Sequence, residues 1–246
     1  MADEKKMSLT GHLSDLRRCI VVTLIGIALG FLAAWNFTGP ILAFLQTPIQ
    51  PVQSKLLMIA PTEAFFTQLK VAFLAGVMIS LPLTLYQLWS FISPGLHSSE
   101  RSLSLPFVIL STICFLIGAA FAFFVVMPFG IQFLVGYAGA AYSASITVGN
   151  YISFTIRMLL VFGIVFEMPL ASYLLTRFGL LTPAVLRRNR RYAIVLMFVA
   201  AAILTPPDIF TQVLMAGPLL ILYEVSIGTS KIALRRRKTR ETADES

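Results

Sequence analysis

Long apolar segments with very few charges inside them are the feature that most constrains this chain. Residues 19–37, 69–92, 103–136 and 151–176 are each long enough, as helices, to cross the roughly 30 Å hydrocarbon core of a bilayer. Only 12% of the 246 residues are charged, about half of what soluble domains carry. A soluble fold would lack the polar surface to cover so much apolar material. The sequence therefore predicts an all-α, polytopic membrane protein, and it argues against a soluble enzyme, a disordered chain or a compact nucleic-acid-binding domain.

Two further apolar stretches near the C-terminus are short or interrupted. Residues 193–204 would form a helix of only about 18 Å, and residues 209–227 carry Gly217-Pro218. The sequence Thr205-Pro206-Pro207-Asp208 between them predicts a tight turn. We predict six spans with short fifth and sixth helices. An alternative has four spans and a last hairpin that enters the membrane without crossing it. The 103–136 segment is too long for one straight crossing, and Pro128 and Gly130 are expected to end or kink it.

The distribution of basic residues predicts the topology. With six spans, sixteen of the 19 lysines and arginines fall on the side of both termini, and only Lys55 and Lys70 fall on the other side. The positive-inside rule then places both termini in the cytoplasm, and the net charge of +8 requires no nucleic-acid partner. The first span is expected to be retained, since no small-residue cleavage site is evident. Residues 1–230 are predicted to form one transmembrane domain and residues 231–246 a charged, disordered tail.

Several polar residues lie in apolar surroundings. Glu167, inside the fourth span, is costly there unless it is paired, protonated or facing water, so it either makes a structural hydrogen bond between helices or forms a polar or proton-binding site. Asp208 suits the cap of the last helix, and Gln212 lies one turn further on the same face. Glu63, in the first outer loop, suits a cap before the second span. Arg157 is expected to extend its side chain to the outer surface.

Two carboxylates lie on the basic, cytoplasmic side. Asp15 and Glu100 could pair with nearby arginines, as exposed ion pairs of small energy. Alternatively, because they lie on separate elements, each could accept a bidentate guanidinium from a cationic ligand. Other chemistry is poorly supported: His12 and His97 have no ligand neighbours for a metal, and there is no Gly-rich phosphate loop and no Ser–His pair in the spans. No catalytic residue and no cofactor is expected.

A set of motifs distributed along the chain resembles the TatC family, the multispanning core of the twin-arginine protein translocase. The motifs are His12-Leu13-x-Asp15-Leu16-Arg17-Arg18, Pro61–Phe65, Phe91-Ile92-Ser93-Pro94-Gly95-Leu96 with Glu100-Arg101, Phe162–Pro169, Arg190-Arg191-Tyr192 and Leu204–Asp208. They cover nearly the whole chain in order. The resemblance implies six spans in the plasma (inner) membrane and a receptor for signal peptides with consecutive arginines, exporting folded proteins with the proton-motive force.

The resemblance also implies roles for individual residues. Asp15 and Glu100 map onto the acidic residues that contact the arginine pair, and Asp15 is one methylene shorter than the family's usual Glu. With Leu16, Arg17, Phe91 and Pro94 they form the expected signal-peptide site. Glu167, Thr205, Asp208 and Gln212 map onto the region that meets TatA- and TatB-type single-span subunits, and Pro48 and Glu63 onto an outer cap. Self-association in a multimeric complex is expected. The main alternative is a proton-coupled secondary transporter using Glu167, and a second is a membrane scaffold without ligand recognition.

Overall fold

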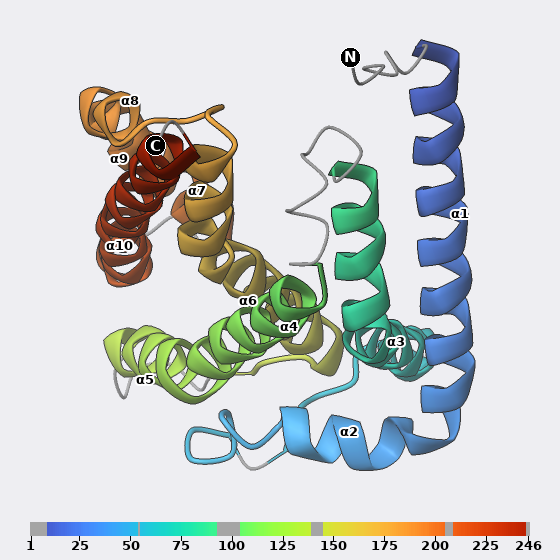
Figure 1. Cartoon of the computed structure of the whole chain (residues 1–246). Coiled ribbons are helices and arrows are strands. Elements are labelled where there is room, and N and C mark those ends of the chain that lie inside the picture. Colours follow the sequence, from blue (N-terminus) through green and yellow to red (C-terminus); the bar gives the residue numbers. More distant parts are fainter. Residues whose placement is uncertain (1–8, 54, 93–103, 139–144, 205–208, 245–246) are drawn as a thin grey trace. The chain divides into compact units, whose positions relative to one another are not determined.

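The computed structural model describes residues 9–53, 55–92, 104–138, 145–204 and 209–244, and these are helical apart from short connections (Figure 1). In chain order the elements are α1 (Leu9–Ala34), the 3₁₀ turn η1 (Trp35–Phe37), α2 (Thr38–Leu45), α3 (Pro61–Ile92), α4 (Ser104–Phe121), the π-helical turn η4 (Ala122–Val126), α5 (Met127–Ala138), α6 (Val148–Phe166), α7 (Met168–Arg177), α8 (Pro183–Arg188), α9 (Arg190–Leu204) and α10 (Ile209–Asp244). The extended pairing within these ranges is an isolated bridge between Leu57 and Thr147. The predicted all-α class is confirmed.

Five helical stretches in the described residues are long and apolar enough to cross a membrane. They are Leu13–Leu45, Pro61–Phe91, Leu105–Tyr137, Val148–Arg177 and Thr211–Arg237. Helix α9 has 15 residues and is therefore about 22 Å long, which is shorter than the hydrocarbon core. The protein is thus a multi-pass membrane protein, while a sixth crossing by α9 stays a prediction.

The chain divides into two compact units. The described residues of Met1–Leu42 and Phe65–Thr112 form the first unit, and those of Ala43–Ala64 and Ile113–Ser246 form the second. The boundaries fall inside α2, α3 and α4, so a unit does not correspond to whole helices.

In the first unit, α1 and α3 approach each other closely at two glycines. A Cβ atom placed on Gly30 would lie 2.7 Å from the carbonyl oxygen of Gly76, and one placed on Gly76 would lie 2.7 Å from the amide nitrogen of Phe31. Only residues without a side chain allow backbones this close, as is common between helices in membranes. Further along the pair, the Cys19 thiol donates to the carbonyl of Gln87 at 3.4 Å.

In the second unit, an irregular turn precedes Pro128. The amide of Met127 bonds to the carbonyl of Ala122, five residues back, which defines the π-helical turn η4. Proline has no N–H and its ring crowds the carbonyl four residues earlier, so a wider turn at this point accommodates Pro128 without ending the helix. The helix continues to Ala138, and Phe123 in the turn stacks on Phe44 with ring centroids 4.8 Å apart. Neither Pro128 nor Gly130 ends the segment.

The C-terminal residues differ from the expected disordered tail. Helix α10 has 36 residues and continues past Lys231 to Asp244, so the last helix is not short as expected. Ala233 is buried, the Arg237 guanidinium lies against Gly179, and Arg236 reaches the hydroxyl of Tyr173 at 3.5 Å. Because arginine stems and small residues pack along α7 here, a charged composition is compatible with a helix.

Candidate functional site

The N-terminal motif lies on the first turns of α1. Asp15 is half-buried, whereas Leu16 and Arg17 are exposed. Asp15 precedes Cys19 by four residues, so both lie on one face of α1, and Cys19 contacts the carbonyl of Gln87 on α3. Asp15 is therefore on the α3-facing side of α1, one turn beyond the contact between the two helices.

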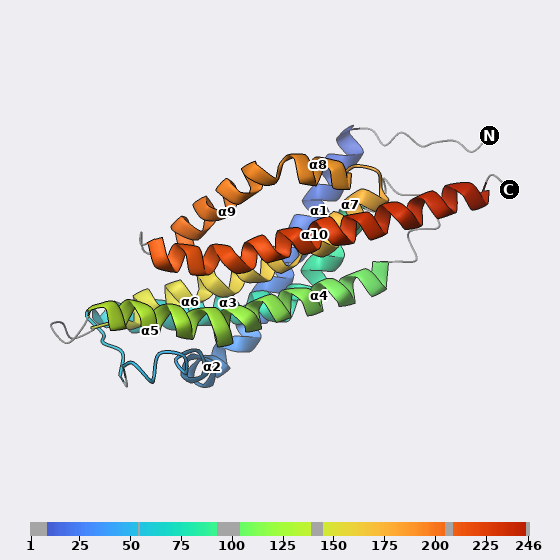
Figure 2. The same cartoon turned by 90° about the vertical axis from the view of Figure 1, so that its left-hand side faces the viewer.

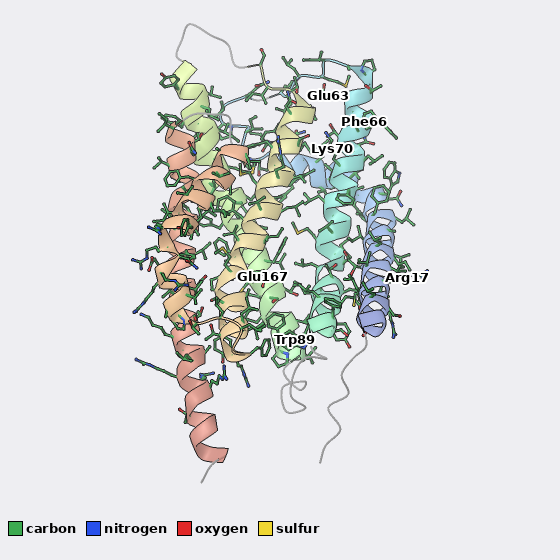
Figure 3. The ribbon with its side chains drawn as sticks, turned by 90° about the horizontal axis from the view of Figure 1, so that it is seen from above. Arg17, Glu63, Phe66, Lys70, Trp89 and Glu167 are labelled. Carbon is green, nitrogen blue, oxygen red and sulfur yellow. The ribbon has the colours of Figure 1, made fainter. Side chains whose placement is uncertain are left out.

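The end of α3 carries the second motif. Phe91 is half-buried and follows Gln87 by four residues, one turn closer to the end of the helix. Trp89 is buried, and the centroid of its ring lies 4.4 Å from the centroid of the Phe107 ring. Figure 3 shows Arg17 and Trp89 at this end of the first unit. Asp15 and Phe91 thus each lie one turn beyond the Cys19–Gln87 contact, while Pro94 and Glu100 lie outside the described residues.

Glu167 lies at the break between α6 and α7 (Figure 3). Its amide donates to the carbonyl of Ile164 at 3.1 Å, and its carbonyl accepts from Ala171 at 2.8 Å. Pro169 is in the first turn of α7, where the lack of an N–H is tolerated, so the break follows from the sequence Glu-Met-Pro. The side chain of Glu167 is half-buried, as expected for a polar residue within a span.

A ladder of hydrogen-bonded hydroxyl groups, not predicted from the sequence, joins α7 to α10. The Pro169 carbonyl accepts from both Ser172 Oγ (2.9 Å) and Thr229 Oγ1 (2.8 Å). One turn further, the hydroxyls of Thr176 and Ser230 lie 2.6 Å apart, and both residues are fully buried. Hydroxyl residues spaced by four on each helix, at 172 and 176 and at 226 and 230, were the available signal. In Figure 1, α7 and α10 lie side by side along this ladder.

The last two long helices, α9 and α10, form a hairpin that is bonded at both ends (Figure 2). Near the start of α10, Gln212 Nε2 donates to the Phe198 carbonyl at 2.9 Å. At the other end, Arg190 and Glu224 form an ion pair at 2.6 Å. Thr205 and Asp208 lie outside the described residues. The Gln212 amide donor thus has an intramolecular partner in addition to any role toward other subunits.

Glu63 and Pro48, the residues expected in an outer cap, both lie in the second unit. Glu63 accepts from the amide of Gly149 at 2.7 Å with one oxygen and from the amide of Ile59 at 2.9 Å with the other. A Cβ on Gly149 would lie 2.8 Å from Glu63 Oε1, the oxygen that accepts from the Gly149 amide. Glycine is therefore required for this hydrogen bond as it stands. Pro48 is buried, and the Tyr151 hydroxyl donates to the Leu45 carbonyl nearby at 2.7 Å. One carboxylate therefore connects the start of α3 to the start of α6.

Within the described ranges, no group of three or more His, Cys, Asp or Glu side chains is placed to hold a metal ion.

Comparisons with known proteins agree in one family. A family model described as "Sec-independent protein translocase protein (TatC)" matches residues 11–218. The protein of that name from Carboxydothermus hydrogenoformans is 42% identical over 230 residues, covering 93% of this chain and 95% of its own length. The one from Aquifex aeolicus is 39% identical over 236 residues, covering 94% and 98%. A crystal structure described as a twin arginine translocase receptor, TatC, is 38% identical with a TM-score of 0.83, covering 90% of this chain and 99% of its own.

Proposed function

Since the chain belongs to the TatC family of Sec-independent protein translocase proteins, we propose that it is the receptor and core subunit that recognises signal peptides with an arginine pair. Family membership makes it a membrane component of a protein translocase, with a transport role and not a catalytic one. The related crystal structure is described as a twin arginine translocase receptor, which supports extending that role to this chain.

The proposed recognition chemistry pairs two carboxylates with two guanidinium groups. Asp15 and Glu100 would each accept a planar, bidentate arginine, a geometry that lysine cannot reproduce. The observation that carries the proposal is the placement of Asp15 and Phe91 one turn beyond the Cys19–Gln87 contact. Residues of the first two motifs of the resemblance thus lie at one end of the α1–α3 pair, and Glu100 follows Phe91 by nine residues.

We also propose that partner subunits and the energy source for export are those that the family resemblance implies. TatA- and TatB-type single-span subunits would dock along Glu167, Thr205, Asp208 and Gln212, copies of the chain would associate, and the proton-motive force would drive export. The distribution of lysine and arginine supports cytoplasmic termini and an even number of spans. Partial burial of Glu167 at a helix break supports a polar position within the bilayer.

Peptide binding tests the receptor proposal directly. Purified full-length chain is titrated with a signal peptide carrying Arg-Arg and with the same peptide carrying Lys-Lys. Loss of one charge-assisted bidentate contact weakens binding about tenfold or more, so we expect that loss for Lys-Lys and for Asp15→Asn or Glu100→Gln. Asp15→Glu, which restores the family's usual residue, is the matched control and should bind at least as well as the native chain.

Two outcomes would overturn the proposal. If the Lys-Lys peptide binds as tightly as Arg-Arg, arginine recognition is absent. If Asp15→Asn and Glu100→Gln both bind normally while melting at the native temperature, the carboxylates are surface ion pairs, as a scaffold would predict. The proton-coupled transporter alternative is disfavoured by the family assignment. It would require Glu167→Gln to abolish small-solute uptake and leave protein export intact.

A further inference from the structure

A pocket in the second unit has the chemistry of an amphiphile site. Its volume is about 440 Å³, within the usual range for small-molecule sites. Apolar side chains from α5, α6 and α9 line most of it, among them Ile131, Val135 and Ile203. The polar side chains in the lining are Asn150, Arg157 and Tyr151, and the Tyr151 hydroxyl is bonded to the Leu45 carbonyl. The pocket therefore offers an apolar chamber with one cation and one amide.

The Arg157 side chain in the pocket lining is directed toward the start of α6. Asn150, Phe154 and Arg157 are spaced by four and three residues and share one face of α6. Arg157 Nε donates to the carbonyl of Ser153 at 3.2 Å, one turn back, so the guanidinium is directed toward the start of α6. None of the described residues that line the pocket is acidic, so the lining does not neutralise this charge.

The depth of Arg157 matches the boundary between lipid tails and headgroups. The span Val148–Arg177 has 30 residues, about 45 Å, so about 7 Å would extend beyond a 30 Å hydrocarbon core at each end if it were centred. Arg157 is nine residues from Val148, about 14 Å along the helix, which leaves its backbone about 6 Å inside the core. Directing the side chain back one turn brings the guanidinium close to the headgroup level, where an anion would lower the cost of the charge.

We propose that this pocket binds one anionic phospholipid. Its phosphate pairs with the Arg157 guanidinium and the Asn150 amide, and one acyl chain fills the apolar chamber. Arginine suits phosphate because it presents two parallel N–H donors. Charge complementarity selects the lipid's anionic headgroup, and the apolar lining selects its tail over a water-soluble phosphate. The bound lipid would bridge α5, α6 and α9, so it is expected to stabilise the packing of the short helix α9 in particular.

The test measures lipid binding by native mass spectrometry and by thermal unfolding of the delipidated full-length chain. Phosphatidylglycerol and phosphatidylcholine with identical acyl chains, and soluble glycerol 3-phosphate, are compared. We expect phosphatidylglycerol to bind at least about tenfold more tightly than phosphatidylcholine and to raise the melting temperature, and glycerol 3-phosphate to do neither. Arg157→Gln should remove the preference, whereas Arg188→Gln, an equal charge change on the exposed helix α8, should retain it.

A second variant addresses the tail. Val135→Phe places a larger side chain in the chamber and leaves Arg157 intact, so it should weaken phosphatidylglycerol binding without affecting the charge. Equal binding of both lipids by the native chain would overturn the proposal, since the headgroup would not be recognised. Binding of glycerol 3-phosphate as tight as that of the lipid would also overturn it, because the site would then be a phosphate site. If Arg157→Gln retains the preference and Val135→Phe binds phosphatidylglycerol with native affinity, the lipid lies elsewhere.

Discussion

Replacing Gly76 with alanine should separate α1 from α3. The added Cβ would lie 2.7 Å from the amide nitrogen of Phe31 and 2.9 Å from the carbonyl oxygen of Ile27, whereas ordinary contacts begin at 3.4 Å. These neighbours are backbone atoms that no rotamer change can move, so the helices must part by about 0.7 Å. A gap of that size forfeits a quarter to a half of the dispersion attraction across the contact. Overpacking of this kind costs about 1–3 kcal/mol.

The comparison must allow for the higher helix propensity of alanine, which contributes about 1 kcal/mol in favour of any such substitution. Gly228→Ala is the matched control, because it lies within α10 and has open space where its Cβ would go. Relative to Gly228→Ala, Gly76→Ala should lower stability by about 1–3 kcal/mol, equivalent to about 2–12 °C in melting temperature for a chain of this length. Thermal unfolding in one detergent, followed by circular dichroism, measures the difference.

The double variant Gly30→Ala with Gly76→Ala gives a sharper result. A single displacement of the helices relieves both clashes, so the double substitution should cost less than the sum of the two single ones. If Gly76→Ala melts at or above the temperature of Gly228→Ala, or if the two costs add, the close approach of α1 and α3 is not what limits stability.

Three other substitutions test contacts in the second unit by the same melting measurement. Glu63→Gln removes the charge that accepts two backbone N–H groups and should lower the melting temperature. An unchanged melting temperature would mean that these two hydrogen bonds do not contribute to stability. Thr176→Val keeps the shape and removes the hydroxyl facing Ser230, costing about 0.6 kcal/mol and at most about 1.7, so a larger loss would indicate packing instead. Glu224→Gln breaks an exposed ion pair with Arg190 and should change stability by less than about 1 kcal/mol; a greater effect would contradict the exposure of both groups.

The long helices were predictable because a bilayer imposes a length and a composition on each of them. Glu63 and Glu167 were also identified from the sequence, since carboxylates next to apolar segments have few structural solutions, whereas the helix break at Glu167 was not predicted. At the start of α8, the Thr182 hydroxyl accepts from the Val185 amide and Pro183 lies in the first turn, an arrangement that these residue types favour. Apart from the break, these features depend on residues that are close together in the sequence, so the sequence alone is enough to predict them.

Contacts between distant segments were not predictable in this way. Gly26 and Gly30 form a G-x-x-x-G pattern on α1, but nothing in the sequence says that Gly76 is the residue opposite. The hydroxyl ladder likewise requires the register between α7 and α10. The helical continuation beyond Lys231 was missed because its charge suggests disorder, whereas the packing of Ala233 and Arg237 overrides composition.

The hydrogen bond between Glu63 and Gly149 affects the order in which the chain assembles. Its partner Gly149 is synthesised 86 residues later, so at roughly 5–20 residues per second Glu63 waits about 4–17 s for that amide to leave the ribosome. Gly30 and Gly76 are much nearer in sequence and can meet well before then. In the nascent chain, α1 and α3 can therefore pack early. The bond between Glu63 and Gly149 forms only after the second half of the protein has begun to insert.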